Sequence, residues 1–302
     1  MSHGPVVCQT GEVELRAHWR PRSGALCVSA IVLACTAVIP AQALAQRDTL
    51  YWRLADRGPG IPTSMFGTSV SARELLFYPF FEYYHDRNAE YSPEELGYGL
   101  DQDFRGKYRA SEALIFLGYG VSDRLALELE AAVITAQQDK APEDPSNMPS
   151  QLKQSGLGDV ESEIRWRWNH ETDRSPEVFS YFETTFPAQK AKKLIGTPNW
   201  EYKLGTGVVR GFRWGTTTAR VSVEYDEGSL ALGEMAVEYL KRISPTVRLF
   251  AGVEAEQDEV ELITEAQWFL RPNVFLKLNN SFGLSSKATD WAPEIGLMFS
   301  FR

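Results

Sequence analysis

Apolar and polar residues alternate along most of this chain, and the clearest case is the stretch GDVESEIRWRWNH (158–170). One register of this stretch is mostly apolar, from Val160 to Trp168. The opposite register carries only charged residues between them, namely Glu161, Glu163, Arg165 and Arg167. Successive side chains of a strand point to opposite faces, so this period of two predicts a β-strand with one apolar face.

The same alternation recurs to the end of the chain and predicts about twelve strands. Most of these segments are about 9–13 residues long, whereas strands of soluble proteins usually have about 5–6 residues. A tilted strand needs about 9–11 residues to cross a bilayer, so the lengths favour membrane strands. The predicted strands are residues 74–86, 110–121, 124–136, 158–170, 177–187, 201–212, 218–225, 233–242, 246–256, 259–270, 274–284 and 291–301.

The connections between the predicted strands alternate in length. Tight turns such as 122–123 and 244–245 alternate with longer polar loops such as 87–109 and 139–156. A short turn at 257–258 is the exception. Short turns at one end and longer loops at the other are typical of outer-membrane barrels. An even number of strands would leave both chain ends on the short-turn side, which we expect to face the periplasm.

A sheet that crosses a membrane must close on itself, because lipid offers no partner for the polar backbone groups of an open edge. We therefore predict an all-β fold, a transmembrane antiparallel up-and-down β-barrel of about twelve strands over residues 72–302. The apolar register would face lipid and the charged register the lumen. The alternative is a soluble β-sandwich or barrel with the apolar register inside. The number and length of the strands favour the membrane.

The first 45 residues have the features of a cleaved secretory signal peptide. Three arginines between 16 and 22 precede the apolar run 24–40, and Ala43-Leu44-Ala45 fits an A-x-A cleavage site. A retained anchor and a lipoprotein cut before Cys35 are the alternatives. Together with the predicted barrel, the signal peptide predicts that the mature chain lies in the outer membrane. Residues 46–71 do not alternate cleanly, and we expect them to form a periplasmic tail or a plug in the lumen.

The polar register of the predicted strands supplies the candidate functional residues. Acidic side chains dominate it, and an acidic ring in a pore favours cations over anions. The alternative is that these charges pair across a narrow lumen and fill it. The predicted lumen-lining residues are Glu128, Glu130, Glu161, Glu163, Arg165, Arg167, Arg220, Glu224, Glu234, Glu238, Arg248, Glu254, Glu261, Glu265, Lys277 and Glu294.

Large aromatic residues fall near both ends of the predicted strands. Such rings sit at the headgroup level of a bilayer and form two girdles around an outer-membrane barrel. On the short-turn side the predicted girdle residues are Trp168, Trp214 and Trp268, and on the long-loop side they are Trp200, Tyr225 and Trp291.

Composition excludes several classes of chemistry. All three cysteines precede the predicted cleavage site, so the mature chain would have neither disulfides nor a thiolate nucleophile. Only His85 and His170 remain as histidines, and the topology puts them at opposite ends of the barrel. We predict no enzyme, no cofactor and no metal site, since the acidic loop 140–147 fits a solvated loop better than a Ca²⁺ site. The net charge of −9 argues against nucleic acid as a partner.

The stretch SGLGDVESEIRWRW (155–168) resembles the Gly-x-Gly-Asp motif and amphipathic strand of the outer-membrane family labelled MetA-pathway of phenol degradation. The segment YFETTFPAQ (181–189) is similar to the strand and loop that follow in that family, although the family pattern Pro-Thr-Gly reads Pro-Ala-Gln here. The resemblance covers about residues 156–301. It implies a transporter-like barrel that helps small, often hydrophobic or aromatic, molecules across the outer membrane.

Two functions remain open at this point. The first is a channel or transporter-like barrel whose partners are outer-membrane lipid and a small-molecule solute. The second is a non-conducting structural or surface-recognition barrel with a charge-filled lumen. The final segment EIGLMFSFR (294–302) resembles the C-terminal signal read by the barrel-assembly machinery, with Arg302 following the closing Phe301 as a departure from the usual pattern.

Overall fold

The computed structural model describes residues 52–187, 194–226 and 228–302. The predicted signal peptide and the three cysteines therefore lie outside the described residues. Among the described residues, no helix is long and apolar enough to cross a bilayer.

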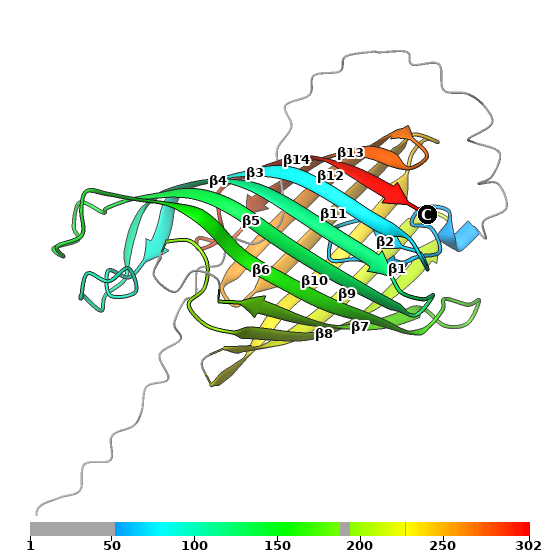
Figure 1. The fold of residues 1–302 in the computed structure, drawn as a ribbon, viewed down its shortest axis with the longest axis horizontal. Helices are drawn as coiled ribbons and strands as arrows, with labels where there is room; N and C mark the ends of the chain where they lie inside the picture. The colour runs from blue at the N-terminus through cyan, green and yellow to red at the C-terminus, as the bar shows by residue number, and fades with distance from the viewer. Residues whose placement is uncertain (1–51, 188–193, 227) are drawn as a thin grey trace, which may run out of the picture.

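Twelve antiparallel strands form a closed barrel (Figure 1). Each strand pairs with its neighbours in the chain, and β14 pairs with β3 to close the ring. The predicted all-β, up-and-down barrel is thus confirmed. The strands are β3 (Leu75–Tyr91), β4 (Phe104–Gly120), β5 (Leu125–Asp139), β6 (Gln151–Asn169), β7 (Glu177–Phe186), β8 (Glu201–Phe212), β9 (Gly215–Asp226), β10 (Ser229–Arg242), β11 (Val247–Glu256), β12 (Glu259–Arg271), β13 (Val274–Gly283) and β14 (Ala292–Phe301).

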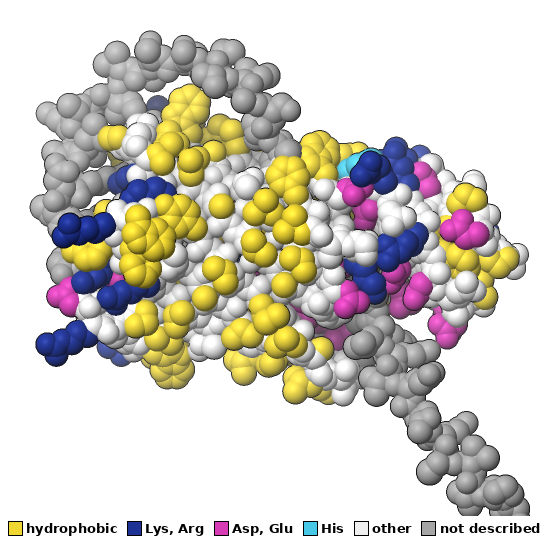
Figure 2. All heavy atoms as spheres, turned by 180° about the vertical axis from the view of Figure 1, so that it is seen from behind, with side chains coloured by type: hydrophobic (Ala, Val, Ile, Leu, Met, Phe, Trp, Pro, Cys, Tyr) yellow, Lys and Arg dark blue, Asp and Glu magenta, His cyan; other side chains and the backbone are white. Residues whose placement is uncertain are grey.

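The strands alternate between a buried and an exposed side chain at almost every step. In β5, Leu127, Leu129 and Val133 are exposed, and the intervening Glu128 and Ala132 are buried. Figure 2 shows apolar side chains over the middle of the outer surface and charged ones gathered toward its two ends. The apolar register therefore faces outward, as predicted, and the charged register faces the interior.

Seven strands, β3 to β6, β9, β10 and β12, are longer than the sequence predicted, and β3 to β6 are the longest of the barrel. β3 to β6 contain 17, 17, 15 and 19 residues, and the other eight contain 10 to 14. In Figure 1 these four extend beyond the rest at the long-loop end. The predicted loops 87–109 and 139–156 were too long, because strand pairing continues where the outward side chains turn polar. Lys153 and Ser155 of β6 are outward and exposed in this part.

The N-terminal hairpin (residues 52–74) lies inside the barrel at the short-turn end. It consists of the short helix η2 (Trp52–Leu54) and the paired two-residue strands β1 (Ile61–Pro62) and β2 (Ser69–Val70). Its loop touches inward side chains of opposite walls, since Ser64 bonds to Glu128 of β5 and the Phe66 carbonyl oxygen accepts from Lys277 of β13.

One wall of the interior is apolar, which the sequence analysis did not foresee. The inward side chains of β3 and β4 include Tyr78, Phe80 and Phe116, all buried. They form one cluster with Ile61 and Val70 of the N-terminal hairpin. Charged residues line the barrel mainly from β5 to β12, so the hairpin packs between an apolar wall and a charged wall.

Candidate functional site

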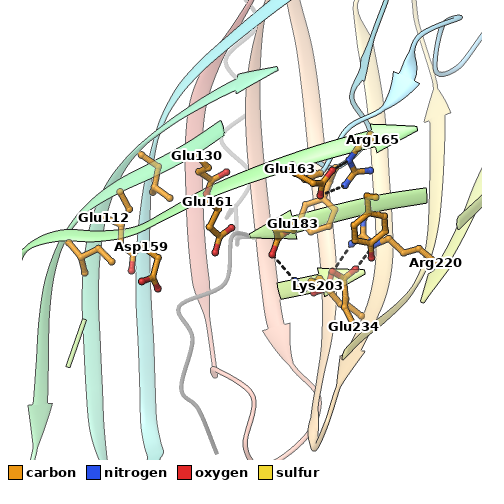
Figure 3. Close-up of a pocket in the computed structure, with 17 residues that line it drawn as sticks. Glu112, Glu130, Asp159, Glu161, Glu163, Arg165, Glu183, Lys203, Arg220 and Glu234 are labelled. Atoms are coloured by element: carbon orange, nitrogen blue, oxygen red, sulfur yellow. Dashed lines mark hydrogen bonds and ion pairs between the residues drawn. The ribbon is translucent and has the colours of Figure 1, made fainter. Parts of the chain in front are cut away.

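A cavity in the middle of the barrel, beyond the tip of the N-terminal hairpin, is lined by eleven charged residues (Figure 3). We call it the vestibule. Its free volume is about 80 Å³, well below the roughly 300–1,000 Å³ of a typical small-molecule pocket. The charged side chains that line it are Glu112, Glu130, Asp159, Glu161, Glu163, Glu183, Glu234 and Glu254, with Arg165, Lys203 and Arg220.

Arg165 links the vestibule to the N-terminal hairpin. It pairs with Glu163 on its own strand and, through Nε, with Glu128 Oε1 at 3.3 Å. The two carboxylates lie side by side because Glu128 and Glu163 are register partners on β5 and β6. The guanidinium also donates to the carbonyl oxygen of Pro62 at 3.2 Å. One buried cation therefore offsets two carboxylates and holds the hairpin.

Arg220 of β9, three strands away from Arg165, has the same function. It pairs with Glu234, with Glu238 at 2.7 Å and with Glu254 at 3.0 Å, so strands β9, β10 and β11 share one guanidinium. Its guanidinium carbon lies 5.5 Å from the ring centre of Phe66. The vestibule thus ends at the tip of the hairpin with a cation against an aromatic ring.

Phe66 at the hairpin tip packs against an apolar patch of the wall, which we call the apolar collar and define as Leu240, Phe250 and Ile263 on the neighbouring strands β10, β11 and β12. The ring centres of Phe66 and Phe250 are 5.3 Å apart. Hydrogen bonds fix the backbone next to this ring, since Gln267 Nε2 donates to Gly67 O at 3.2 Å. Packing and hydrogen bonds from the same wall, β10 to β12, therefore hold the phenyl ring inside the barrel.

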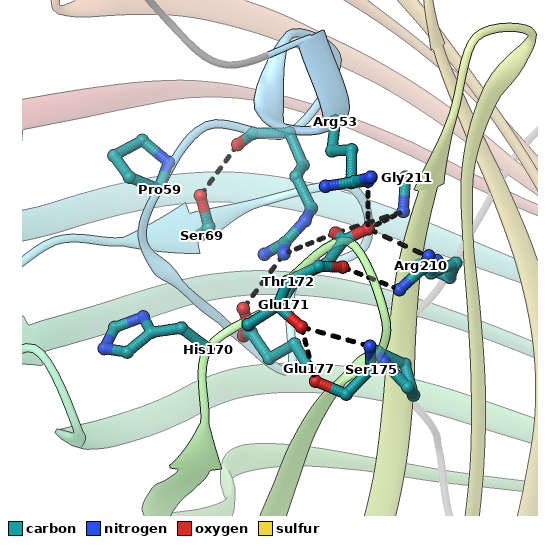
Figure 4. A network of polar contacts seen from close by, with 12 residues as sticks. Arg53, Pro59, Ser69, His170, Glu171, Thr172, Ser175, Glu177, Arg210 and Gly211 are labelled. Carbon is teal, nitrogen blue, oxygen red and sulfur yellow. Dashed lines mark hydrogen bonds and ion pairs between the residues drawn. The ribbon is translucent and has the colours of Figure 1, made fainter.

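The base of the hairpin is fastened by charged groups at the short-turn end (Figure 4). Arg57 pairs with Glu177 at 2.9 Å and with Glu171 at 3.3 Å. Arg167, only 1% exposed, pairs with Glu177 at 3.0 Å and donates to the carbonyl oxygen of Pro59 at 3.1 Å. The turn 170–176 therefore contributes a carboxylate that holds the hairpin in place.

A second cavity, which we call the antechamber, lies between the hairpin and the wall formed by β10 to β14. Its volume is about 660 Å³. Exposed residues of the β12–β13 turn, Pro272 and Asn273, form part of its rim, so it lies at the short-turn end. Its charged lining residues among those described are Arg57, Glu74, Arg242, Arg248 and Arg302.

The predicted lumen residues are divided among these places. Arg248 lines the antechamber and Arg167 holds the hairpin base. Glu224 pairs with Lys203, and Lys277 pairs with Glu265 at 2.9 Å. Glu261 accepts a hydrogen bond from Ser281, and Glu294 accepts one from Asn279. Glu128 pairs with Arg165, and Glu238 pairs with Arg220. The remaining predicted lumen residues line the vestibule.

Four charged vestibule residues were missed: Glu112, Asp159, Glu183 and Lys203. All four lie in segments that were predicted as strands. The inward register of those segments contains them, so extending the same alternation to every strand would have found them.

The six predicted girdle residues fall in two groups at opposite ends of the strands. Five are exposed, and Trp291 is half-buried. Trp214 stacks on Phe212 with ring centres 4.7 Å apart, and Trp200 stacks on Tyr202 at 6.4 Å. Their contact with lipid headgroups stays a prediction.

The two histidines of the predicted mature chain lie at opposite ends. His85 of β3 forms a bridge with Trp291, and His170 lies in a short turn with Nε2 at 3.3 Å from Asp123 Oδ2. The described ranges contain no group of three or more His, Cys, Asp or Glu side chains that could hold a metal ion.

No family model matches the chain, and no curated protein is similar to it in sequence. Membership of the phenol-degradation family therefore stays a prediction. Solved structures are similar in fold. The COG4313 outer membrane channel from Pseudomonas putida F1 aligns over 76% of this chain and 96% of its own, with 12% identity and a TM-score of 0.56. This chain shares the closed-barrel fold of that outer membrane channel.

Two further solved structures align less well. The KdgM porin in complex with oligogalacturonate covers 76% of this chain and 99% of its own, with 6% identity and a TM-score of 0.47. The translocator domain of the autotransporter NalP from Neisseria meningitidis covers 75% and 88%, with 12% identity and a TM-score of 0.46. At these identities the likeness concerns the fold.

Proposed function

We propose that the protein is a channel for small molecules across the outer membrane, and that the N-terminal hairpin closes it. The observation that carries this proposal is the order of the two cavities along the barrel. A charged vestibule and a larger antechamber lie on either side of the ring of Phe66 and its apolar collar. Two separate cavities within one barrel favour a channel over a scaffold whose interior is filled.

Phe66 and the collar act as the gate in this proposal. An apolar constriction excludes water and so stops conduction even where the adjoining spaces are polar. The ring belongs to the hairpin, whereas the collar residues Leu240, Phe250 and Ile263 belong to the barrel wall. Movement of the hairpin would therefore remove half of the barrier without disturbing a barrel strand.

In this proposal the vestibule determines which solutes, cationic or anionic, are favoured on the long-loop side of the gate. Carboxylates outnumber cations among its described lining residues, so we expect small cations to be favoured over anions there. Passage of hydrophobic or aromatic solutes follows from the family resemblance and is part of the proposal. We also propose that the apolar outer face contacts lipid and that the barrel-assembly machinery recognises the last strand.

Substitution Phe66→Ala tests the gate. We expect the variant to conduct in planar lipid bilayers far more often than the unmodified protein, because the collar then no longer closes on a ring. The measurement is single-channel current, paired with solute uptake into liposomes. Phe182→Ala is the matched control, since Phe182 is an exposed phenylalanine on the outer face of β7. A folded Phe66→Ala barrel without current and without uptake would refute the channel.

One observation favours a non-conducting recognition barrel as the second candidate. The loops at the long-loop end have an apolar core of their own, formed by Tyr91, Phe104, Ala141 and Met148. Tyr91 also donates to Asp144 at 3.0 Å, which ties the two loops together. Under this alternative, deletion of residues 92–103 and 140–150 would abolish binding of a surface partner and leave permeability unchanged.

A further inference from the structure

Basic side chains gather on the outer face of β3, β4 and β6, in the part where the long strands extend beyond the rest of the barrel (Figure 1). Arg109 of β4 and Lys153 of β6 are both register partners of Gln137, which lies between them on β5. Lys107 lies on the same face as Arg109, two residues nearer the loops. We call this group the basic row, and its members are Arg87, Lys107, Arg109 and Lys153.

The basic row lies beside the level at which the aromatic residues predict lipid headgroups. Arg109 is the register partner of His85, and His85 forms a bridge with the predicted girdle residue Trp291. Tyr83, on the same face as His85, packs edge-on against Trp291 with ring centres 6.1 Å apart. A strand rises about 3.3 Å per residue, so Lys107 lies only about 7 Å further along β4 than Arg109. The row is therefore at the height of a headgroup.

Nearer the middle of the barrel, the same strands present apolar side chains in a row of their own. Phe81 is opposite Ala113, Ala113 is opposite Val133, and Val133 is opposite Leu157. Phe81, Val133 and Leu157 are exposed. Arg109 and Ala113 are four residues apart on β4, which is about 13 Å along the strand. One elongated amphiphile can therefore contact the basic row with its charged end and the apolar row with its chains.

The acidic groups at this place offset only part of the positive charge. Arg87 pairs with Asp290 at 2.8 Å, and Arg109 pairs with Asp139 at 3.2 Å. These two carboxylates face four cations of the basic row. Both pairs lie at the surface, where an ion pair contributes little to stability, so each arginine can exchange its carboxylate for another anion at small cost.

We propose that the basic row binds the phosphate headgroup of a lipid in the leaflet on the long-loop side, and that the lipid chains lie along Phe81, Val133 and Leu157. Arginine and lysine donate charge-assisted hydrogen bonds to phosphate oxygens. The lipid is held on one side of the barrel, since the exposed residues at the same end of β8, β9 and β10 include aromatic and aliphatic ones, Trp200, Tyr225 and Leu230. The inference rests on the proposed contact of the outer face with lipid and adds the class of lipid and its place.

The test is calorimetric titration of the full mature barrel in a non-ionic detergent with dioctanoyl phosphatidic acid, dioctanoyl phosphatidylcholine and inorganic phosphate. The two lipids share their chains and differ in headgroup charge, whereas inorganic phosphate has the charge without the chains. We expect phosphatidic acid to bind about tenfold or more tightly than either of the others, because only it matches both rows.

Substitutions in the basic row should change this affinity in both directions. Lys107→Gln and Arg109→Gln should each weaken phosphatidic acid by about three- to tenfold, because each removes a hydrogen bond to a charged group. Asp139→Asn should tighten it, since Arg109 then has no carboxylate to exchange. Arg213→Gln, at an exposed arginine of the β8–β9 turn, is the control and should leave the affinity unchanged.

Equal affinity for the two lipids, or phosphatidic acid binding that none of the row variants alters, would overturn the site. Inorganic phosphate that binds as tightly as phosphatidic acid would assign the row to the free ion and would overturn the lipid. Titration in detergent needs neither a bilayer nor an open lumen, so either failure would leave the channel proposal standing. A barrel that binds phosphatidic acid but does not conduct would in turn refute the channel alone.

Discussion

Single side chains offset several carboxylates at once in the interior of this barrel. Arg220 pairs with three glutamates from two strands, and Arg165 pairs with two. Taking charges out of water costs several kcal/mol per ion, and only good pairing offsets this cost. The arginines are therefore the residues on which the charged wall depends.

Replacement of Arg220 by methionine should be among the most destabilising changes in the wall. The variant leaves Glu234, Glu238 and Glu254 without their shared cation, so we expect the free energy of unfolding to fall by about 3–5 kcal/mol. Urea titration of the barrel refolded into lipid measures it. Arg271→Met, at an exposed position of β12, is the control. An equal loss in both variants would contradict the role of Arg220.

Gly67 is required where the hairpin turns. Its φ is +59°, and a Cβ there would lie 2.8 Å from Gln267 Nε2. Gly67→Ala should cost about 1–2 kcal/mol from the left-handed backbone alone, and more from the clash. Gly228→Ala is a matched control, because its φ is +89° and a Cβ there would meet nothing within 4 Å. Similar unfolding energies for the two variants would refute the clash.

At the scale of elements, the N-terminal hairpin is held by side chains rather than by strand pairing. Its two strands have two residues each and pair only with each other. Its attachments to the wall are ion pairs and hydrogen bonds, such as Arg57 with Glu177 and Ser64 Oγ to Glu128 at 2.6 Å. We therefore expect that such an element can leave the lumen while every strand pair of the barrel remains.

A cross-link should lock the hairpin in the closed position. Ser64→Cys with Glu128→Cys, joined by a short bis-maleimide, would tie the tip to β5, and the cysteine-free background expected for the mature chain makes the reaction selective. We expect single-channel activity to disappear on cross-linking, whereas the same variant treated with a monofunctional maleimide should keep its activity. Conduction that persists in the cross-linked protein would argue that solutes pass elsewhere.

The elements differ in how far the sequence predicts them. The strands follow from the period of two, and their number was predicted correctly. The upper ends of β3 to β6 were missed because the outward residues there are polar, as at Lys153. For residues 46–71 the sequence left a periplasmic tail and a plug as alternatives, and the strands of the hairpin were not predicted because a two-residue strand shows no periodicity. The apolar interior wall was missed because β3 is apolar on both faces, with Phe80 inside and Phe81 outside.

For the molecule as a whole, alternation reveals which side chains point inward but not which of them meet. The predicted lumen residues separate into a vestibule, a hairpin anchor and an antechamber, and this division depends on where the hairpin lies. Arg248 and Glu254 share one strand and one register, yet they line two different cavities. The N-terminal hairpin divides the interior between them, and its sequence shows no periodicity from which this position could be predicted.

The hairpin joins the barrel only at its own C-terminal end, where residue 74 precedes β3, and it enters the interior from the end at which that strand begins. Because this attachment lies beside the opening at which the hairpin enters, we expect that the hairpin can leave the lumen and return without passing through the closed ring of strands. The interior would then open while the barrel itself stays intact.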